Sequence, residues 1–248
     1  MAEQIKLTGI VLRSSEHTID AARLLDIFSP DKGRISAVIR GVAKPKAKLA
    51  SASQPFCFGE FMLAQKGNFY TVTDCSIIDS FFGLTYNFDC YVLASSLLEI
   101  TSKVTLSGQE NLEMFTLLLN SLKVLVYERA EPTAITIKFL IETLKKSGFG
   151  FDVSECSVCG KALSNQKQVG LMYEGSGAVC TEHSSRVDHI MLDQSEWGIL
   201  KNINNFSVEE ISGMKFASRE ALTSCLKLML KQFYYRTGEK IKALDKYF

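Results

Sequence analysis

Apolar residues alternate with polar ones along much of the first 80 residues. Five short runs rich in Ile, Val, Phe and Leu show this pattern: IKLTGIVL, ARLLDIF, RISAVIRGV, PFCFGEFMLAQ and FYTVTDCSII. A period of two is typical of strands that bury one face. Turn signals separate the runs, as in SPDKG at 29–33 and KGN at 66–68. The pattern predicts five strands in a small closed barrel or sandwich.

The periodicity becomes helical after residue 80. Apolar side chains recur every three or four positions in four segments, at about 88–103, 110–127, 132–148 and 218–235. Such stripes indicate amphipathic helices that share a core. The order of elements predicts an α+β protein, with a barrel in residues 1–80 and a helical domain in residues 81–248.

Residues 151–188 interrupt the helical pattern with two pairs of metal-binding residue types. Cys156 and Cys159 precede Cys180 and His183 in the spacing C-x2-C-x20-C-x2-H. This spacing approaches that of zinc sites, and thiolates with a neutral imidazole suit tetrahedral zinc. Because protein ligands fill all four positions, the pattern predicts one structural zinc ion. A coincidental arrangement and a redox pair of the first two cysteines are the alternatives.

Composition and segment lengths narrow the class of protein. The 248 residues are 22% charged and 46% hydrophobic, which is typical of globular proteins. No apolar run approaches the roughly 18 to 20 residues that span a bilayer, and the N-terminal segment has no signal-peptide pattern. We therefore expect a soluble cytoplasmic protein whose remaining cysteines are buried thiols.

A basic stretch without acids covers the third predicted strand and the segment after it. Its members are Lys32, Arg34, Arg40, Lys44, Lys46 and Lys48. The whole chain has a net charge of only +1, so an anionic partner would have to bind locally. A basic groove on a small barrel, with aromatic residues such as Phe56, Phe58 and Phe61 nearby, is typical of proteins that bind single strands. A solvated loop, with the phenylalanines in the core, is the alternative.

The C-terminal segment is also basic. Residues 213–248 contain eight Lys or Arg and three Asp or Glu, a net charge of +5. Lys227 and Lys231 lie four positions apart on the last predicted helix. The apolar residues around them are Leu226, Met229, Leu230 and Phe233. These residues could line a groove for an acidic peptide that ends in an aromatic residue. An adaptor that docks acidic peptides is therefore the alternative to a DNA-binding protein.

Several motifs together resemble the bacterial RecO family of recombination mediators. They are GIVLR, GRISAVIRGVAKPKAKL, QPF, the cysteine pairs and the RTG of YYRTGEKIKAL, so the similarity covers essentially the whole chain. It implies an N-terminal OB-fold, and a helical domain with a zinc element inserted at about 151–188. Many relatives have Cys where this chain has His183. The segment SSEHTIDA lacks the family's usual loop of glycine and acid, so no functional residue is assigned to it.

The resemblance also implies a function. It implies binding of single- and double-stranded DNA, annealing of complementary strands, and cooperation with RecR in placing RecA on DNA coated by single-strand-binding protein (SSB). The acidic SSB tail would bind the helical domain. We expect the DNA contacts at Arg34, Arg40, Lys44, Lys46 and Lys48. No nucleotide-binding motif GxxxxGK[ST] is present, so we expect no enzymatic activity. A zinc enzyme acting on nucleic acid is a third hypothesis, although no HExxH-type element accompanies the cysteines.

Overall fold

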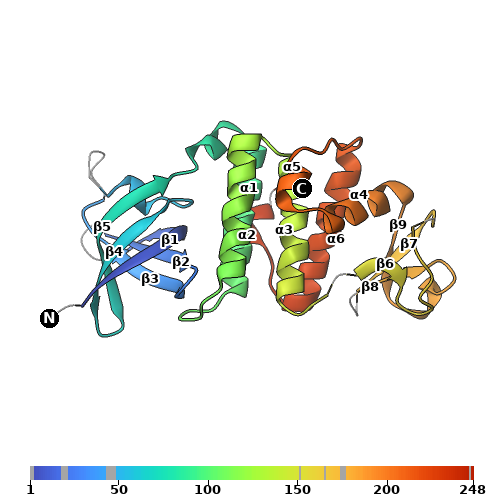
Figure 1. Ribbon diagram of the computed structural model, residues 1–248, viewed down its shortest axis with the longest axis horizontal. Coiled ribbons are helices and arrows are strands. Elements are labelled where there is room, and N and C mark those ends of the chain that lie inside the picture. The colour runs from blue at the N-terminus through green and yellow to red at the C-terminus, as the bar shows by residue number, and fades with distance from the viewer. Residues whose placement is uncertain are drawn as a thin grey trace. The chain divides into compact units, whose positions relative to one another are not determined.

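The computed structural model describes residues 3–17, 22–42, 49–150, 152–164, 166–173, 177–245 and 247–248. The chain forms two compact units, Met1–Val126 and Tyr127–Phe248 (Figure 1). The domain limits expected near residue 80 stay a prediction. No helix in the described ranges has both the length and the hydropathy that a membrane crossing requires.

The first unit begins with a closed barrel. Its strands are β1 (Glu3–Glu16), β2 (Arg23–Ser29), β3 (Gly33–Ile39), β4 (Phe58–Lys66) and β5 (Phe69–Asp79). Neighbouring strands follow the order β1-β2-β3-β5-β4, and β4 pairs with β1 to close the barrel. The described pairs are antiparallel, apart from the parallel pair of β3 and β5. This is the arrangement of an OB-fold, so the predicted five-stranded barrel is confirmed.

Alternate strand positions fill the barrel. The buried apolar side chains of its interior include Leu7, Val11, Leu25, Ile27, Ile35, Ala37, Ile39, Phe61, Leu63 and Val72. Successive side chains of a strand point to opposite faces, which explains why the alternation in the sequence predicted these strands.

Two helices pack on the barrel within the first unit (Figure 1). They are α1 (Phe88–Val104) and α2 (Leu112–Lys123). The side chain of Asn87 accepts a hydrogen bond from the Cys90 amide at 2.9 Å, and this bond caps the start of α1. The short helical turns of the unit are the 3-10 helices Ser51–Ser53 and Phe82–Tyr86, and the π-helical stretch Val124–Glu128 follows α2.

The turn between β2 and β3 is fixed to the connection between α1 and α2. The amide of Arg34 donates to the carbonyl oxygen of Leu106 at 3.2 Å, and the amide of Asn111 donates to that of Pro30 at 2.8 Å. Gly33 has a φ of +60°, and a Cβ there would lie 2.3 Å from the carbonyl oxygen of Gln109. Only glycine fits this approach. The start of β3 is therefore held by backbone contacts.

The second unit combines a helical core with a small sheet. Its helices are α3 (Pro132–Lys146), α4 (Gln194–Asn205), α5 (Val208–Ser212) and α6 (Arg219–Thr237), with the 3-10 turns Ser184–Arg186 and Lys242–Leu244. Its strands are β6 (Asp152–Cys156), β7 (Val169–Met172), β8 (Gly177–Cys180) and β9 (His189–Leu192). They pair in the order β6-β8-β7-β9, and α3 packs against the other three helices. Helices with a small inserted sheet agree with the predicted α+β class.

The four predicted helices are confirmed as α1, α2, α3 and α6, whereas the sequence analysis missed α4 and α5. Both missed helices begin with a capping box. The side chain of Asp193 accepts from the amide of Glu196, and that of Ser207 accepts from the amide of Glu210. This pattern of a capping residue followed three positions later by Glu was visible in the sequence.

Candidate nucleic-acid surface and metal centre

The predicted basic loop starts where β3 ends. Arg40 is exposed and follows the last residue of the strand. Lys44, Lys46 and Lys48 fall in residues 43–48, which lie outside the described residues. Of the basic loop from Arg40 to Lys48, the structure thus describes the first cation, which faces solvent at the end of a barrel strand.

Arg34 lies at the other end of β3 and is half-buried. Its Nε donates to the carbonyl oxygen of Thr105 at 2.9 Å, and its Nη1 donates to Oγ of Ser102 at 3.2 Å. The guanidinium therefore joins β3 to the end of α1. The assignment of Arg34 as a DNA contact stays a prediction. A phosphate would have to bind a guanidinium that already donates these two hydrogen bonds.

The three phenylalanines considered for base stacking face protein. Phe56 and Phe61 are buried. The ring of Phe58 lies 6.1 Å from that of Phe115 in α2, measured between centroids. The alternative interpretation as core is correct for Phe56 and Phe61, whereas Phe58 is half-buried. Stacking on the barrel therefore requires a different aromatic residue.

The four residues of the Cys/His pattern come together in the second unit. Their ligand atoms, from Cys156, Cys159, Cys180 and His183, all lie within 4.8 Å of one another. Nδ1 of His183 lies 3.2 Å from Sγ of Cys180 and 3.9 Å from Sγ of Cys156. Four ligands at about 2.3 Å from a central ion would lie roughly 3.8 Å apart in a tetrahedron. The cluster could therefore hold a metal ion with little rearrangement.

The backbone explains why these side chains converge. The first pair sits on a tight turn, in which the amide of Gly160 donates to the carbonyl oxygen of Cys156 at 2.8 Å and Gly160 has a φ of 69°. The amide of Ser157 donates to the carbonyl oxygen of Ala178 in β8, which leads into the second pair. Pairing of β6 with β8 thus places one turn beside the other.

The cluster also favours the thiolate form of one ligand. Burial raises the pKa of the Cys156 thiol, but hydrogen bonds with the backbone of Cys180, Val158 and Cys159 outweigh it and lower this pKa to about 6. Thiolates are the form of cysteine that binds metal ions. The donor set and its geometry thus both suit a metal ion that is coordinated by protein alone.

The apolar residues expected to line a groove on α6 are core residues instead. Leu226, Met229 and Phe233 have 0% of their surface exposed, because they face the interior of the second unit. Lys227 and Lys231 are exposed, as expected. The prediction that the apolar residues line a groove was wrong for Leu226, Met229 and Phe233, whereas Leu230 is half-buried. A stripe at helical spacing does not reveal whether other helices cover it.

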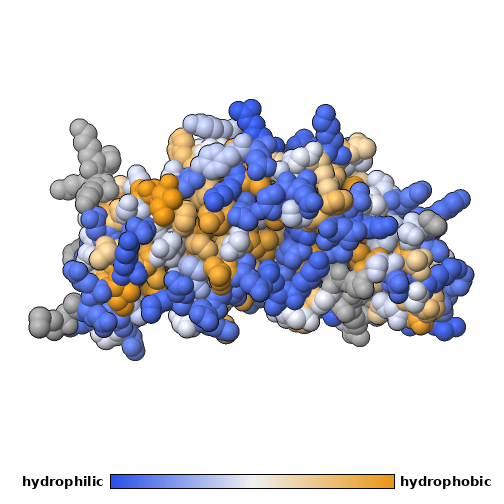
Figure 2. All heavy atoms as spheres, viewed as in Figure 1, coloured by the Kyte–Doolittle hydropathy of each residue, from blue (hydrophilic) through white to orange (hydrophobic). Residues whose placement is uncertain are grey.

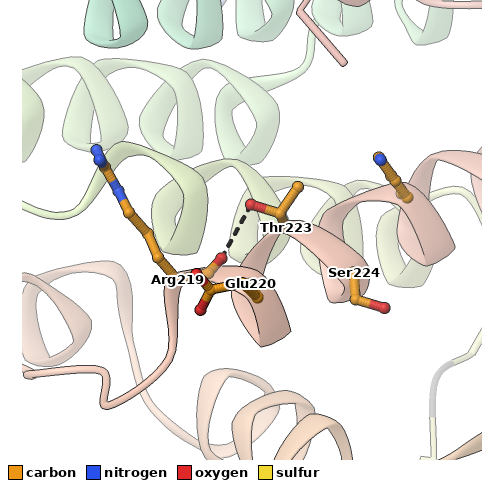
Figure 3. A pocket seen from close by; sticks show the side chains of 5 residues that line it. Arg219, Glu220, Thr223 and Ser224 are labelled. Atoms are coloured by element: carbon orange, nitrogen blue, oxygen red, sulfur yellow. Dashed lines mark hydrogen bonds between the residues drawn. The ribbon is translucent and has the colours of Figure 1, made fainter.

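A pocket of about 450 Å³ does lie on the exposed side of α6. It is lined by Arg219, Glu220, Thr223, Ser224 and Lys227. Figure 3 shows the Thr223 hydroxyl bonded to the backbone of the preceding turn, where it donates to the carbonyl oxygen of Arg219 at 2.9 Å. Arg219 is one of the eight basic residues counted in 213–248, but it was not assigned to the peptide site, although the positions 219, 223 and 227 follow the four-residue spacing of one helix face.

The fold and the clusters define a class of α+β proteins, in which an OB-type barrel precedes a helical unit with a four-ligand Cys/His cluster. The family model described as "Recombination protein O N terminal" matches residues 1–81, and the one described as "Recombination protein O C terminal" matches residues 86–243. The chain belongs to the RecO family of DNA repair proteins.

Curated relatives carry the same family name. The "DNA repair protein RecO" of Caldicellulosiruptor saccharolyticus is 31% identical over 178 residues, which cover 72% of this chain and 71% of the relative. The protein of the same name from Acetivibrio thermocellus is 33% identical over 159 residues, which cover 64% of this chain and 63% of the relative. The protein of the same name from Clostridium novyi is 25% identical over 242 residues, which cover 97% of this chain and 92% of the relative. The resemblance inferred from the motifs is thereby confirmed.

Proposed function

We propose that the chain binds DNA and anneals complementary single strands, and that it acts as a mediator which helps to load a recombinase onto SSB-coated DNA. The observation that carries this proposal is the exposed Arg40 at the end of β3 of an OB-type barrel, where the basic stretch to Lys48 begins. OB-folds bind oligonucleotides on their outer face and loops. The proposed contacts are Arg40, Lys44, Lys46 and Lys48, with Arg34 assisting from the strand.

Annealing by such a surface requires no hydrolysis. Cations that neutralise phosphates release condensed counterions and lower the repulsion between two strands. Base pairing then supplies the free energy of the reaction. A protein without catalytic residues can therefore perform it, and we assign none to this chain.

We infer that the Cys156–His183 cluster holds one structural zinc ion. Three thiolates with one imidazole are a frequent ligand set for structural zinc, and four protein ligands leave no open position for a substrate. The ion would supply folding free energy to the small sheet around it.

The proposed partners of the mediator are RecR, the acidic C-terminal tail of SSB and, indirectly, RecA. For the tail we propose the exposed face of α6, with Lys227 and Lys231 supplying positive charge next to the pocket. The ammonium of Lys227 lies 5.0 Å from the ring centroid of Phe248, so an aromatic residue of the tail would have to replace this intramolecular contact. The proposed location of this activity is the bacterial cytoplasm, at the nucleoid.

The salt dependence of single-stranded DNA binding tests the proposed surface. Each phosphate contact contributes about −0.7 to the slope of log affinity against log salt. A variant with Lys44, Lys46 and Lys48 all changed to Ala should have a slope that is shallower by roughly two units. A control variant removes the same charge from three exposed lysines elsewhere, Lys123, Lys167 and Lys215. An equal slope in both variants would remove the loop from the proposal.

Annealing is tested separately with complementary oligonucleotides that have no single-stranded tails, in the absence of ATP. We expect acceleration at low salt that fades as salt is added, because screening weakens the phosphate contacts. No acceleration at low salt would contradict the annealing function, even if DNA binding were intact.

A second candidate function is that of an adaptor for acidic peptides, and the observation that favours it is the pocket beside Lys227. The lysine variants separate the two functions. Loss of charge at Lys44, Lys46 and Lys48 should weaken DNA binding and leave peptide binding unchanged. If the affinities for DNA and for the peptide both decrease, one site serves both partners.

A further inference from the structure

The hairpin of β4 and β5 presents one aromatic ring to solvent. Phe69 is the first residue of β5 and has 79% of its surface exposed. The next residue, Tyr70, packs against the barrel core, and Val72 is buried in it. Alternation along the strand therefore turns Phe69 and Thr71 outward. Gly67 has a φ of 60°, as tight hairpin turns require.

An exposed phenylalanine at this place is notable because other barrel phenylalanines, such as Phe56 and Phe61, are buried. Figure 2 shows that apolar side chains do reach the surface of the molecule in several places. A single exposed apolar residue therefore needs a further reason before it is assigned a role. The reason here is its position relative to Arg40.

Phe69 lies on the outer face of β5, and Arg40 directly follows the neighbouring strand β3. Val38 of β3 lies opposite Thr71 of β5 in a parallel pair. Phe69 is therefore level with Ser36, and Arg40 lies four residues further along β3. At about 3.3 Å per residue the separation along the strands is about 13 Å, a length that a few nucleotides cover.

The surface between these two residues is compatible with a phosphate chain. Ser36 is exposed, and Thr71 and Val38 are half-buried. Asp26 of the neighbouring strand accepts a hydrogen bond from the Ser36 hydroxyl at 2.8 Å and pairs with Arg13 at 3.1 Å. The charge of this carboxylate is therefore compensated within the barrel.

We propose that Phe69 stacks on an unpaired base of single-stranded DNA that runs over the outer face of β3 and β5 toward Arg40. This inference rests on the proposed DNA-binding function and assigns it a residue and a path. The loop between β4 and β5 is one of the places where OB-folds contact oligonucleotides. Stacking accepts every base, which suits a protein that binds without regard to sequence.

Phe82 supplies a matched control within the same unit. It is also an exposed phenylalanine, with 62% of its surface accessible, and its ring contacts that of Tyr86. The segment around it, residues 74–102, contains Asp74, Asp79, Asp89 and Glu99 and no Lys or Arg. This segment has a net negative charge, which disfavours a phosphate chain near it, so Phe82 should not contact DNA.

The test compares Phe69→Ala with Phe82→Ala in the full chain, with an oligo(dT) probe. Phe69→Ala should weaken binding about 5- to 150-fold, as loss of one stacked base does. The salt slope should not change, because stacking releases no counterions. Thermal unfolding should be unchanged as well, since the ring is exposed. Phe82→Ala should bind like the wild type.

A second variant reports the contact directly. Phe69→Trp keeps an aromatic surface and adds a fluorophore, while the natural Trp197 is only 3% exposed and supplies a constant background. We expect near wild-type affinity, with quenching of the added fluorescence when oligo(dT) binds. A quenched tryptophan together with weakened Phe69→Ala supports the proposal.

Two results would overturn it, and they can be told apart. If the wild type binds oligo(dT) with a steep salt slope but Phe69→Ala binds equally well, the stacking role is wrong and the DNA-binding function stands. If the wild type does not bind oligo(dT) at low salt, both proposals fail together.

Discussion

The guanidinium of Arg34 donates a hydrogen bond of 2.9 Å to the carbonyl oxygen of Thr105, the residue that caps the C-terminal end of α1. The two residues are 71 positions apart in the chain. Carbonyl groups at the end of a helix lack intrahelical partners and carry partial negative charge, so a cation is favoured there. One arginine of the basic stretch therefore has a structural task within the first unit.

Replacement of Arg34 by Ala should reduce stability. We expect a loss of about 1–3 kcal/mol in the free energy of unfolding, because the partly buried partners on α1 lose a charged donor. Urea unfolding measures this effect. Arg40→Ala is the control, and it should change stability by less than about 0.5 kcal/mol because Arg40 is exposed. If Arg34→Ala also changes the free energy of unfolding by less than about 0.5 kcal/mol, the bonds to α1 contribute nothing measurable to stability.

Metal removal should destabilise the second unit. We expect about one zinc ion per chain by elemental analysis, and a lower Tm after treatment with a strong chelator, because a ligand bound only to the folded state stabilises it. Cys159→Ala should lose the ion. Cys225→Ala is the control, since Cys225 is a buried free thiol outside the cluster. An unchanged metal content in Cys159→Ala would contradict the four-ligand site.

Substitutions on α6 should separate core from surface. Phe233→Ala should cost about 3–5 kcal/mol of folding free energy, because it leaves a cavity at a fully buried position. Lys227→Glu should leave stability nearly unchanged but weaken binding of a synthetic acidic peptide that ends in Phe. Fluorescence anisotropy measures the second effect. If Lys227→Glu binds this peptide as the wild type does, the acidic tail does not bind at this face.

The capping box of α4 should contribute measurably to folding. The Asp193 carboxylate accepts from the amides of Ser195 at 2.8 Å and Glu196 at 2.9 Å. Asp193→Ala should therefore lower the free energy of unfolding by about 1 kcal/mol, with a range of roughly 0.5–2. Gln194→Ala, at the exposed first position of the same helix, is the matched control. Similar unfolding curves for the two variants would show that this cap is dispensable.

The sequence alone was sufficient for the five barrel strands and the strongly periodic helices, but it did not predict the sheet of β6 to β9. In β5 the alternation of Tyr70 and Val72 with outward residues reports which face is buried, because side chains of a strand alternate strictly. The missed helix α5 has only five residues, whereas α4 has twelve, as many as the predicted α2. Most residues of α4 are polar, and the buried ones are Trp197, Leu200 and Ile203. The capping boxes of the two helices were the better signal, since a cap depends only on residues a few positions apart.

The metal cluster was predictable for the same local reason. Two ligands on one tight turn are specified by spacing, as with Cys156 and Cys159, and only the approach of the two turns depended on the pairing of β6 with β8. The sequence by itself thus determined the barrel strands, the main helices and the four potential metal ligands. These features depend on neighbours that are close in the chain.

Only the tertiary structure decided which side chains of those elements remain available to a partner. It joined Arg34 to α1, buried Leu226, Met229 and Phe233 under other helices, and left Phe69 exposed. The physical reason is that periodicity identifies a face but does not say what covers it. Covering is done by residues far away in the sequence, whose position is set only when the whole unit packs.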